Sequence, residues 1–250
     1  MPERIEGGGL LVPARRLGGI LLDLLYPPHC ALCGCPVEAG REGERAVFCG
    51  PCLAGIRPAP EHHCPVCSHP MIGRMSCPNC DGRHWHLETI VPACRYEGEV
   101  RGMIQRFKYG RDIAMARPLG ILLARALADP RVAGRTFDAV VPVPLHPRRE
   151  RERGFNQAEL LARLLARSMG LPVRDLLKRR RPTAQQAGFD RPSRMENLRE
   201  ALVLRRPFPP EAAFLLVDDV STTGATLDAC AAVLREAGAA EVSAVVVARG

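Results

Sequence analysis

The fold is decided by the stretch Leu216-Val217-Asp218-Asp219-Val220-Ser221-Thr222-Thr223-Gly224-Ala225-Thr226. A short apolar segment leads into two adjacent carboxylates, and small hydroxyl residues with a glycine then open a helix. Free N–H groups at such a helix start, together with the helix dipole, form a nest for phosphate. The two carboxylates can accept hydrogen bonds from sugar hydroxyls. We therefore predict a sugar phosphate site here, the plain structural alternative being an Asp-capped strand-to-helix turn.

The sequence around this stretch alternates between apolar strands and amphipathic helices. Strands are predicted at Leu87 to Tyr96, Asp138 to Val143, Phe214 to Val217 and Val242 to Ala248. Helices are predicted at Pro118 to Leu127, from the cap Asn156 to Gly170, and from Leu227 to near Gly238. Nearly unbroken apolar strands that alternate with helices are typical of a parallel sheet covered on both faces. The predicted class is α/β, with ligands at the carboxyl ends of the strands.

Eight cysteines form four Cys-x-x-Cys pairs near the N-terminus: Cys30/Cys33, Cys49/Cys52, Cys64/Cys67 and Cys77/Cys80. Two such pairs complete a tetrahedral four-thiolate site, so four pairs predict two structural zinc ions. Iron is the alternative metal, because it is also bound by four thiolates. The pairs can combine sequentially or as a cross-brace, and sequential pairing is favoured because each half then forms one short ribbon.

The remaining cysteines and the nearby histidines are not predicted to be metal ligands. Cys94 and Cys230 are expected to be small buried side chains, and Cys35 is left unpaired. Eight thiolates already satisfy two ions, so the histidines of this region are not expected to bind metal: His29, His62, His63, His69, His84 and His86.

Composition and charge favour phosphate-bearing partners and argue against a membrane protein. The 250 residues carry a net charge of +8, which suits phosphates, either free or in nucleic acid. No apolar run approaches the ~20 residues that span a bilayer, and the apolar run around Asp23 lacks a cleavage site. We expect a soluble cytoplasmic protein with no membrane insertion.

The phosphate stretch resembles the 5-phosphoribosyl-1-pyrophosphate (PRPP) motif of type I phosphoribosyltransferases. The whole chain resembles the ComF family of competence-associated proteins, which is related to GntX. The resemblance rests on these segments in order: Leu24 to Pro28, the cysteine pairs, Phe107 to Gly110, Val141 to His146, Arg153 to Gln157, Thr183 to Gln186 with Arg194 and Asn197, and the phosphate stretch. It implies a type I phosphoribosyltransferase-like sheet behind an N-terminal double zinc ribbon.

The resemblance also implies roles for residues. Asp218 and Asp219 would act as the catalytic pair that holds the ribose. The 5′-phosphate would bind to Ser221, Thr222, Thr223, Gly224, Ala225 and Thr226, and the pyrophosphate to Arg148 and Arg149. These arginines, with Arg151 and Arg153, lie in a predicted loop from Pro144 to Gly154, for which a solvated Arg/Glu face is the alternative. Lys178 to Arg181 and the stretch to Asn197 would form a loop that closes over the site, or else a basic contact to nucleic acid.

The implied reaction is pentosyl transfer from PRPP, with Mg²⁺ as cofactor, to a nitrogenous acceptor in a protein of DNA uptake. The alternative is a non-catalytic accessory that binds single-stranded DNA or the competence helicase and uses the phosphate stretch as a ligand sensor. The predicted domains are a leader over 1–28, a double zinc ribbon over 29–84 and a phosphoribosyltransferase-like domain over 85–250.

Overall fold

The structure is a computed structural model that describes residues 27–37, 46–180 and 198–250. Most of the predicted leader, and the part of the predicted closing loop from 181 to 197, lie outside these ranges. The chain divides into two compact units, Met1–Gly55 and Ile56–Gly250. The two halves of the predicted double ribbon therefore fall in different units, which are described separately.

The first unit holds one cysteine turn and one short helix, α2 (Gly50–Gly55). Its turn has a close counterpart in the second unit, 34 positions later in the printed sequence. In the first turn the Gly34 N–H donates to the Cys30 carbonyl at 2.9 Å, and in the second Ser68 donates to Cys64 at 3.0 Å. Gly34 and Ser68 both adopt left-handed backbone, with φ of 71° and 55°. The cysteine turns are thus repeats of one local structure.

The second unit contains all the other helices and strands of the described ranges. In chain order they are β1 (Ile90–Arg95), α3 (Gly98–Tyr109), η2 (Ile113–Met115), α4 (Ala116–Ala124), η3 (Arg125–Ala128), β2 (Ala139–Pro142), α5 (Pro147–Arg153), α6 (Gln157–Met169), β3 (Leu177–Arg179), β4 (Leu202–Leu204), β5 (Ala213–Ser221), α8 (Ala225–Glu236) and β6 (Glu241–Arg249).

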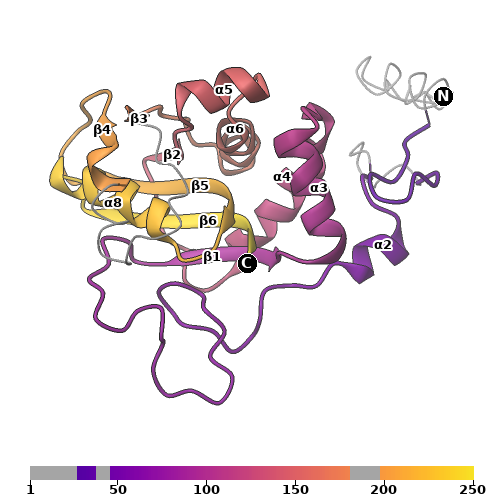
Figure 1. Ribbon diagram of the computed structural model, residues 1–250, viewed down its shortest axis with the longest axis horizontal. Helices are drawn as coiled ribbons and strands as arrows, with labels where there is room; N and C mark the ends of the chain where they lie inside the picture. The colour runs from indigo at the N-terminus through magenta and orange to yellow at the C-terminus, as the bar shows by residue number, and fades with distance from the viewer. Residues whose placement is uncertain (1–26, 38–45, 181–197) are drawn as a thin grey trace, which may run out of the picture. The chain divides into compact units, whose positions relative to one another are not determined.

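Four of the strands form one parallel sheet in the order β1-β6-β5-β2 (Figure 1). In the register, Leu216 of β5 lies between Val141 of β2 and Ala244 of β6. The two prolines of the sheet, Pro92 and Pro142, lie in its outer strands, where a missing N–H is tolerated. Because all four strands run the same way, the residues that follow Arg95, Pro142, Ser221 and Arg249 meet at one carboxyl edge.

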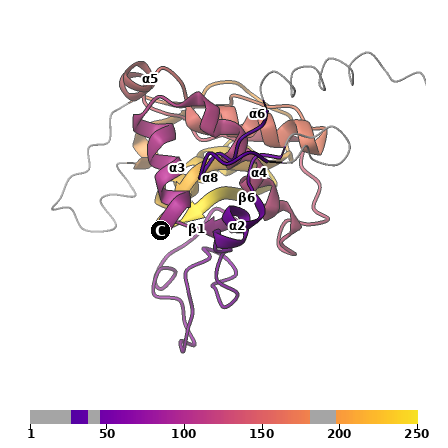
Figure 2. The ribbon, with the colours of Figure 1, turned by 90° about the vertical axis from the view of Figure 1, so that its right-hand side faces the viewer.

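Helices cover both faces of this sheet. On one face α4 and α6 pack against each other and against the strands (Figures 1 and 2). On the other face the apolar side of α8, with Leu227, Cys230 and Leu234, shares a core with Leu216 and with the small antiparallel pair β3-β4. Successive side chains along a strand therefore pack into the cores on opposite faces of the sheet. The predicted α/β class with a parallel, doubly covered sheet is confirmed.

Helix α6 begins and ends where the sequence signals predict. The Asn156 side chain accepts from the Ala158 N–H at 3.1 Å and caps the start of α6, which ends at Gly170 in a left-handed conformation.

In the described ranges, no helix has the length and apolarity needed to cross a bilayer.

One predicted loop is wrong. From Pro147 to Arg153 the chain is helix α5, whose first turn is capped by the His146 ring accepting from the Arg148 N–H at 3.2 Å. Only Pro144 to His146 remains a loop before it. Apolar periodicity could not reveal this helix, because it contains no apolar residue besides proline and is stabilised by an Arg148–Glu152 ion pair at 2.9 Å.

Candidate functional site

The predicted phosphate stretch lies at the carboxyl edge of the sheet, where β5 ends at Ser221 and α8 begins at Ala225. Among the described residues, no backbone carbonyl accepts from the N–H groups of Thr222, Thr223 or Gly224. The Ser221 hydroxyl is buried and, in the same part of the chain, has no hydrogen-bond partner. Free amides and a free buried hydroxyl at a helix start have the chemistry of an anion site.

The two predicted acids lie in β5 directly before this loop. Asp219 is buried, and its Oδ1 lies 2.7 Å from the Nζ of Lys108 on α3. Asp218 is half-buried, and its Oδ1 accepts from the Asp219 N–H at 2.8 Å. The sequence assigns no role to Lys108, which lies in the segment Phe107 to Gly110, because a single lysine carries no signal that it faces an acid pair.

The electrostatics of the pair follow from this burial. Burial and the neighbouring charge of Asp219 raise the pKa of Asp218 to about 7, against a lowering by Lys108. Burial lowers the pKa of the Lys108 ammonium, but the charges of Asp219 and Asp218 outweigh it and raise the pKa above its usual range. The two carboxyl groups therefore share one nearby cation. The first of them ionises readily, whereas ionisation of the second is disfavoured.

The predicted arginines are only partly brought to this site. Arg148 is exposed on α5 and pairs with Glu152. Arg179 of β3 is half-buried, and partial burial lowers the pKa of its guanidinium. The charge of the exposed Arg149 on α5 lowers this pKa further, while Cys230 and Asp218 raise it. Arg179, which belongs to the basic run that begins at Lys178, thus lies close enough to Asp218 for their charges to interact.

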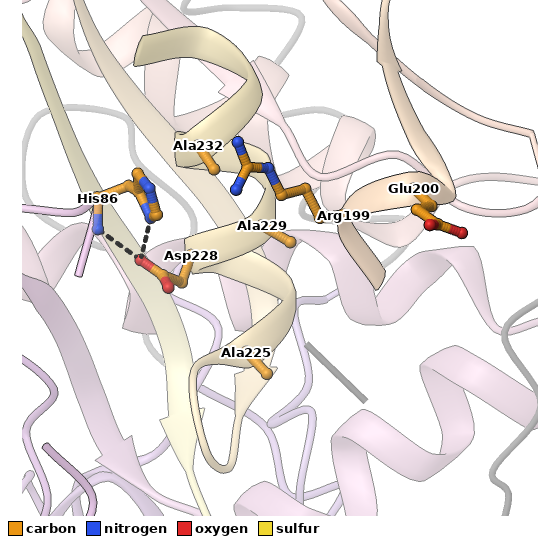
Figure 3. Close-up of a pocket in the computed structure, with 7 residues that line it drawn as sticks. All are labelled: His86, Arg199, Glu200, Ala225, Asp228, Ala229 and Ala232. Carbon is orange, nitrogen blue, oxygen red and sulfur yellow. Dashed lines mark hydrogen bonds and ion pairs between the residues drawn. The ribbon is translucent and has the colours of Figure 1, made fainter. Parts of the chain in front are cut away.

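A pocket of about 510 Å³ opens along α8 (Figure 3). It is lined by three alanines of α8, Ala225, Ala229 and Ala232, and by His86, Arg199, Glu200 and Asp228. Asp228 is buried and accepts from the His86 backbone N–H at 2.7 Å, which ties the chain before β1 to this helix. Of the predicted ligand-binding residues, the pocket includes only Ala225.

The eight predicted metal ligands form two separate clusters in the structure. One joins Cys30, Cys33, Cys49 and Cys52, and the other joins Cys64, Cys67, Cys77 and Cys80. Pairs of sulfurs within them lie 3.5, 3.6 and 3.7 Å apart. Four Zn–S bonds of about 2.3 Å place tetrahedral sulfurs about 3.8 Å apart, so both clusters fit zinc. Sequential pairing is confirmed.

The other cysteines are placed as follows. Cys94 and Cys230 are fully buried, as predicted, and burial raises the pKa of both thiols, that of Cys94 to about 11. The Cys35 sulfur lies 3.3 Å from that of Cys33, which the sequence did not indicate. No histidine joins either cluster in the ranges that the structure covers.

Two family models match parts of the chain. A double zinc ribbon domain matches residues 21–81, and a phosphoribosyl transferase domain matches residues 154–250. With the two four-cysteine clusters and the parallel sheet, these matches define the class: a phosphoribosyltransferase-type domain preceded by a double zinc ribbon with two zinc-binding sites.

Curated relatives then give the family. Competence protein F of Haemophilus influenzae is 33% identical over 78% of this chain and 87% of its own length. The DNA utilization protein YhgH of Escherichia coli is 31% identical over 88% of this chain and 96% of its own. Competence protein ComFC of Streptococcus pneumoniae is 29% identical over 68% and 79%. The chain belongs to the ComF family of competence and DNA utilization proteins.

Solved structures give weaker likenesses. The glutamine PRPP amidotransferase of B. subtilis has a TM-score of 0.34 at 23% identity, over 52% of this chain and 25% of its own. The adenine phosphoribosyltransferase of Leishmania tarentolae has a TM-score of 0.34 at 16% identity, over 55% and 58%.

Proposed function

We propose that the carboxyl edge of the sheet binds PRPP with Mg²⁺ and that the protein transfers the phosphoribosyl group to a nitrogen nucleophile. The carrying observation is the set of free donors at the end of β5: the N–H groups of Thr222 to Gly224 and the buried Ser221 hydroxyl. They lie directly after the acid pair, so one ligand with a phosphate at one end and vicinal hydroxyls at the other would fill both.

Each part of the site has a task in this proposal. The loop from Ser221 to Thr226 binds the 5′-phosphate, and the carboxylate of Asp218 accepts from ribose hydroxyls. Asp219 is held by Lys108 at 2.7 Å, which fixes its orientation before the ligand arrives. Carboxylate oxygens also suit Mg²⁺, which would neutralise charge on the pyrophosphate.

The reaction needs no side-chain nucleophile. The bond from ribose C1 to the pyrophosphate oxygen breaks with its electron pair on pyrophosphate, while the acceptor nitrogen forms a bond to C1 and loses a proton to water. Arg149 and Arg179 supply positive charge on the side of α5 and β3, where a polyanion can leave. Positioning and charge stabilisation are the main contributions of the protein.

We further propose that the protein works in the cytoplasm, because zinc sites made of thiolates need a reducing environment.

Calorimetric titration with PRPP and Mg²⁺ tests the binding step. We expect wild-type protein to bind and the double variant Asp218→Asn/Asp219→Asn to lose at least about tenfold in affinity. A matched control removes two carboxylates at the opposite edge, Asp138 and Glu241, as Asp138→Asn/Glu241→Gln. Equal affinity in all three proteins, or no binding by the wild type, would rule out the site.

A second candidate function is binding of single-stranded DNA or a helicase without catalysis. It is favoured by the relatives, which are named for competence and DNA utilization, and by the net charge of +8.

Two experiments separate the two functions. Release of pyrophosphate from PRPP during incubation with nucleobases and amines supports phosphoribosyl transfer, whereas binding of PRPP without release of pyrophosphate supports a ligand sensor. DNA binding through about five basic contacts should weaken by orders of magnitude between low and moderate salt.

A further inference from the structure

Residues in and beside the second cysteine cluster contact the loop from Ser221 to Thr226, which is called the phosphate loop below. Asn79 lies between the ligands Cys77 and Cys80, and its Nδ2 donates to the Thr223 carbonyl at 3.1 Å. Arg83 follows the same turn, and one of its terminal nitrogens donates to that carbonyl at 3.0 Å. Both side chains are buried at this contact. A single carbonyl in the middle of the loop is thus held by two donors from the ribbon.

Arg83 is itself held in place from two other sides. Its second terminal nitrogen lies 3.3 Å from Asp228 Oδ2 in the first turns of α8. The guanidinium also stacks on Trp85, 3.5 Å from the centre of the ring. Because Asp228 is buried and the pair is desolvated, this arginine has little freedom to leave the Thr223 carbonyl.

Holding that carbonyl also orients an N–H group of the nest. In a trans peptide the C=O of one residue and the N–H of the next point in opposite directions. The Thr223 carbonyl points to Asn79 and Arg83, so the Gly224 N–H points away from the ribbon, and no carbonyl of the described chain accepts from it. The ribbon therefore sets the direction of one of the free donors.

We propose that Asn79 and Arg83 are positioning residues that hold the loop in the form that binds the monophosphate end of a sugar phosphate. This inference rests on the proposed function and adds a role for the second four-cysteine cluster: it presents Asn79 and Arg83 to the loop. The ribbon then acts on ligand affinity without touching the ligand.

The experiment compares affinities for ribose 5-phosphate in the full chain. Arg83→Gln and Asn79→Ala each remove a donor to Thr223, and we expect about tenfold weaker binding in each. Arg83→Lys should be intermediate, because an ammonium cannot bridge the carbonyl and Asp228 as the guanidinium does. Metal content and the thermal midpoint are measured for every protein.

Thr89→Val is the matched control. It removes another hydrogen bond between ribbon and sheet, from Thr89 Oγ1 to the Pro65 carbonyl at 2.8 Å, which does not involve the loop. We expect it to lower stability but to change ribose 5-phosphate affinity less than twofold. If Arg83→Gln does not fold, Asn79→Ala decides the question, since it leaves the Arg83–Asp228 pair intact.

The outcomes separate the two proposals. If wild-type protein binds neither ribose 5-phosphate nor PRPP, the proposed function is wrong and this inference fails with it. If the wild type binds, and the folded, metal-loaded Asn79→Ala and Arg83→Gln proteins bind equally well, the positioning role alone is overturned. Weaker binding by Thr89→Val to the same extent would also overturn it, because the effect would then follow stability.

Discussion

The acid pair of β5 shows how single residues depend on their surroundings. Asp219 is buried against Lys108, whereas Asp218 has a backbone N–H as its nearest donor and a pKa of about 7. Two adjacent carboxylates that share one cation cannot both ionise easily in a buried site. The ionised form of Asp218, which the proposed sugar site would use, is therefore favoured above about pH 7.

The raised pKa of Asp218 predicts a pH dependence of stability. Its folded value of about 7 exceeds the ordinary 3.8, so the folded state takes up a proton that the unfolded chain does not bind. The free energy of unfolding should therefore rise as pH falls from 8 to 6, by at most about 1.4 kcal/mol per pH unit from this group. Denaturant titration at several pH values measures it. Asp218→Asn should lack this component, and an unchanged profile in that variant would contradict the assignment.

The Lys108–Asp219 pair predicts a large stability effect. Lys108→Gln leaves a buried carboxylate without its cation, and we expect a loss of about 3 kcal/mol in the free energy of unfolding. The matched control Arg135→Gln breaks the more exposed pair with Glu241, for which less than about 1 kcal/mol is expected. Losses of equal size in the two variants would show that Lys108 is not needed to offset the charge of Asp219.

At the scale of elements, the turn from β5 to α8 is constrained both by its backbone and by its neighbours. Gly224 precedes α8 with a φ of 76°, which is strained for other residues. The sequence predicted that a glycine, with small hydroxyl residues, opens the helix at this point. The structure adds a second reason, because a Cβ at this position would collide with the side chains of Ile90, in β1, and Trp85.

Gly224→Ala should therefore be destabilising. Its Cβ would lie 2.6 Å from Ile90 Cδ1 and 2.9 Å from an atom of the Trp85 ring, so these side chains must move. We expect a loss of about 3 kcal/mol from overpacking and backbone strain together. Gly102→Ala is the control, since α3 has open space there and alanine should stabilise by about 0.5 kcal/mol. Thermal unfolding of both variants distinguishes the cases.

At the scale of the molecule, the second cysteine cluster belongs to the same unit as the sheet. Ser68 donates to the Ile90 carbonyl at 2.5 Å, and Arg131 reaches both the Pro65 carbonyl and the Ser68 hydroxyl. Burial lowers the pKa of the Arg249 guanidinium, and the thiols of this cluster raise it, which places a cation of β6 near the thiolates. Folding of this ribbon and of the sheet should be coupled.

Removing a ligand of this cluster tests the coupling. Cys77→Ser should reduce the bound zinc from two ions per chain to one, as measured by elemental analysis. It should also lower the free energy of unfolding of the sheet domain by about 3 kcal/mol, because a metal-bound turn that contacts the sheet is lost. Cys35→Ser is the control and should keep both ions, although its sulfur lies close to Cys33. Loss of an ion from Cys35→Ser would make Cys35 a ligand, and iron in either protein would contradict the metal assignment.

Local patterns were enough to predict much of this protein. Paired cysteines with two residues between them are typical of a metal-binding turn, and apolar runs such as Phe214 to Val217 form buried strands. Both clusters and the parallel sheet could therefore be predicted. Helix α5 could not, because its surface is charged all round and its stability comes from a cap and an ion pair. The contacts around the candidate site, however, join residues far apart in the chain.

The sequence by itself determined the fold class, the metal ligands and the position of the turn between β5 and α8 for which phosphate binding is proposed, since each shows in a local pattern of residues. Only the tertiary structure decided that Lys108 meets Asp219 and that Asn79 and Arg83 hold the Thr223 carbonyl. The physical reason is that these partners are separated by more than a hundred residues of chain. Their pairing follows from how α3 and the second ribbon pack at the sheet edge, and no local periodicity encodes that packing.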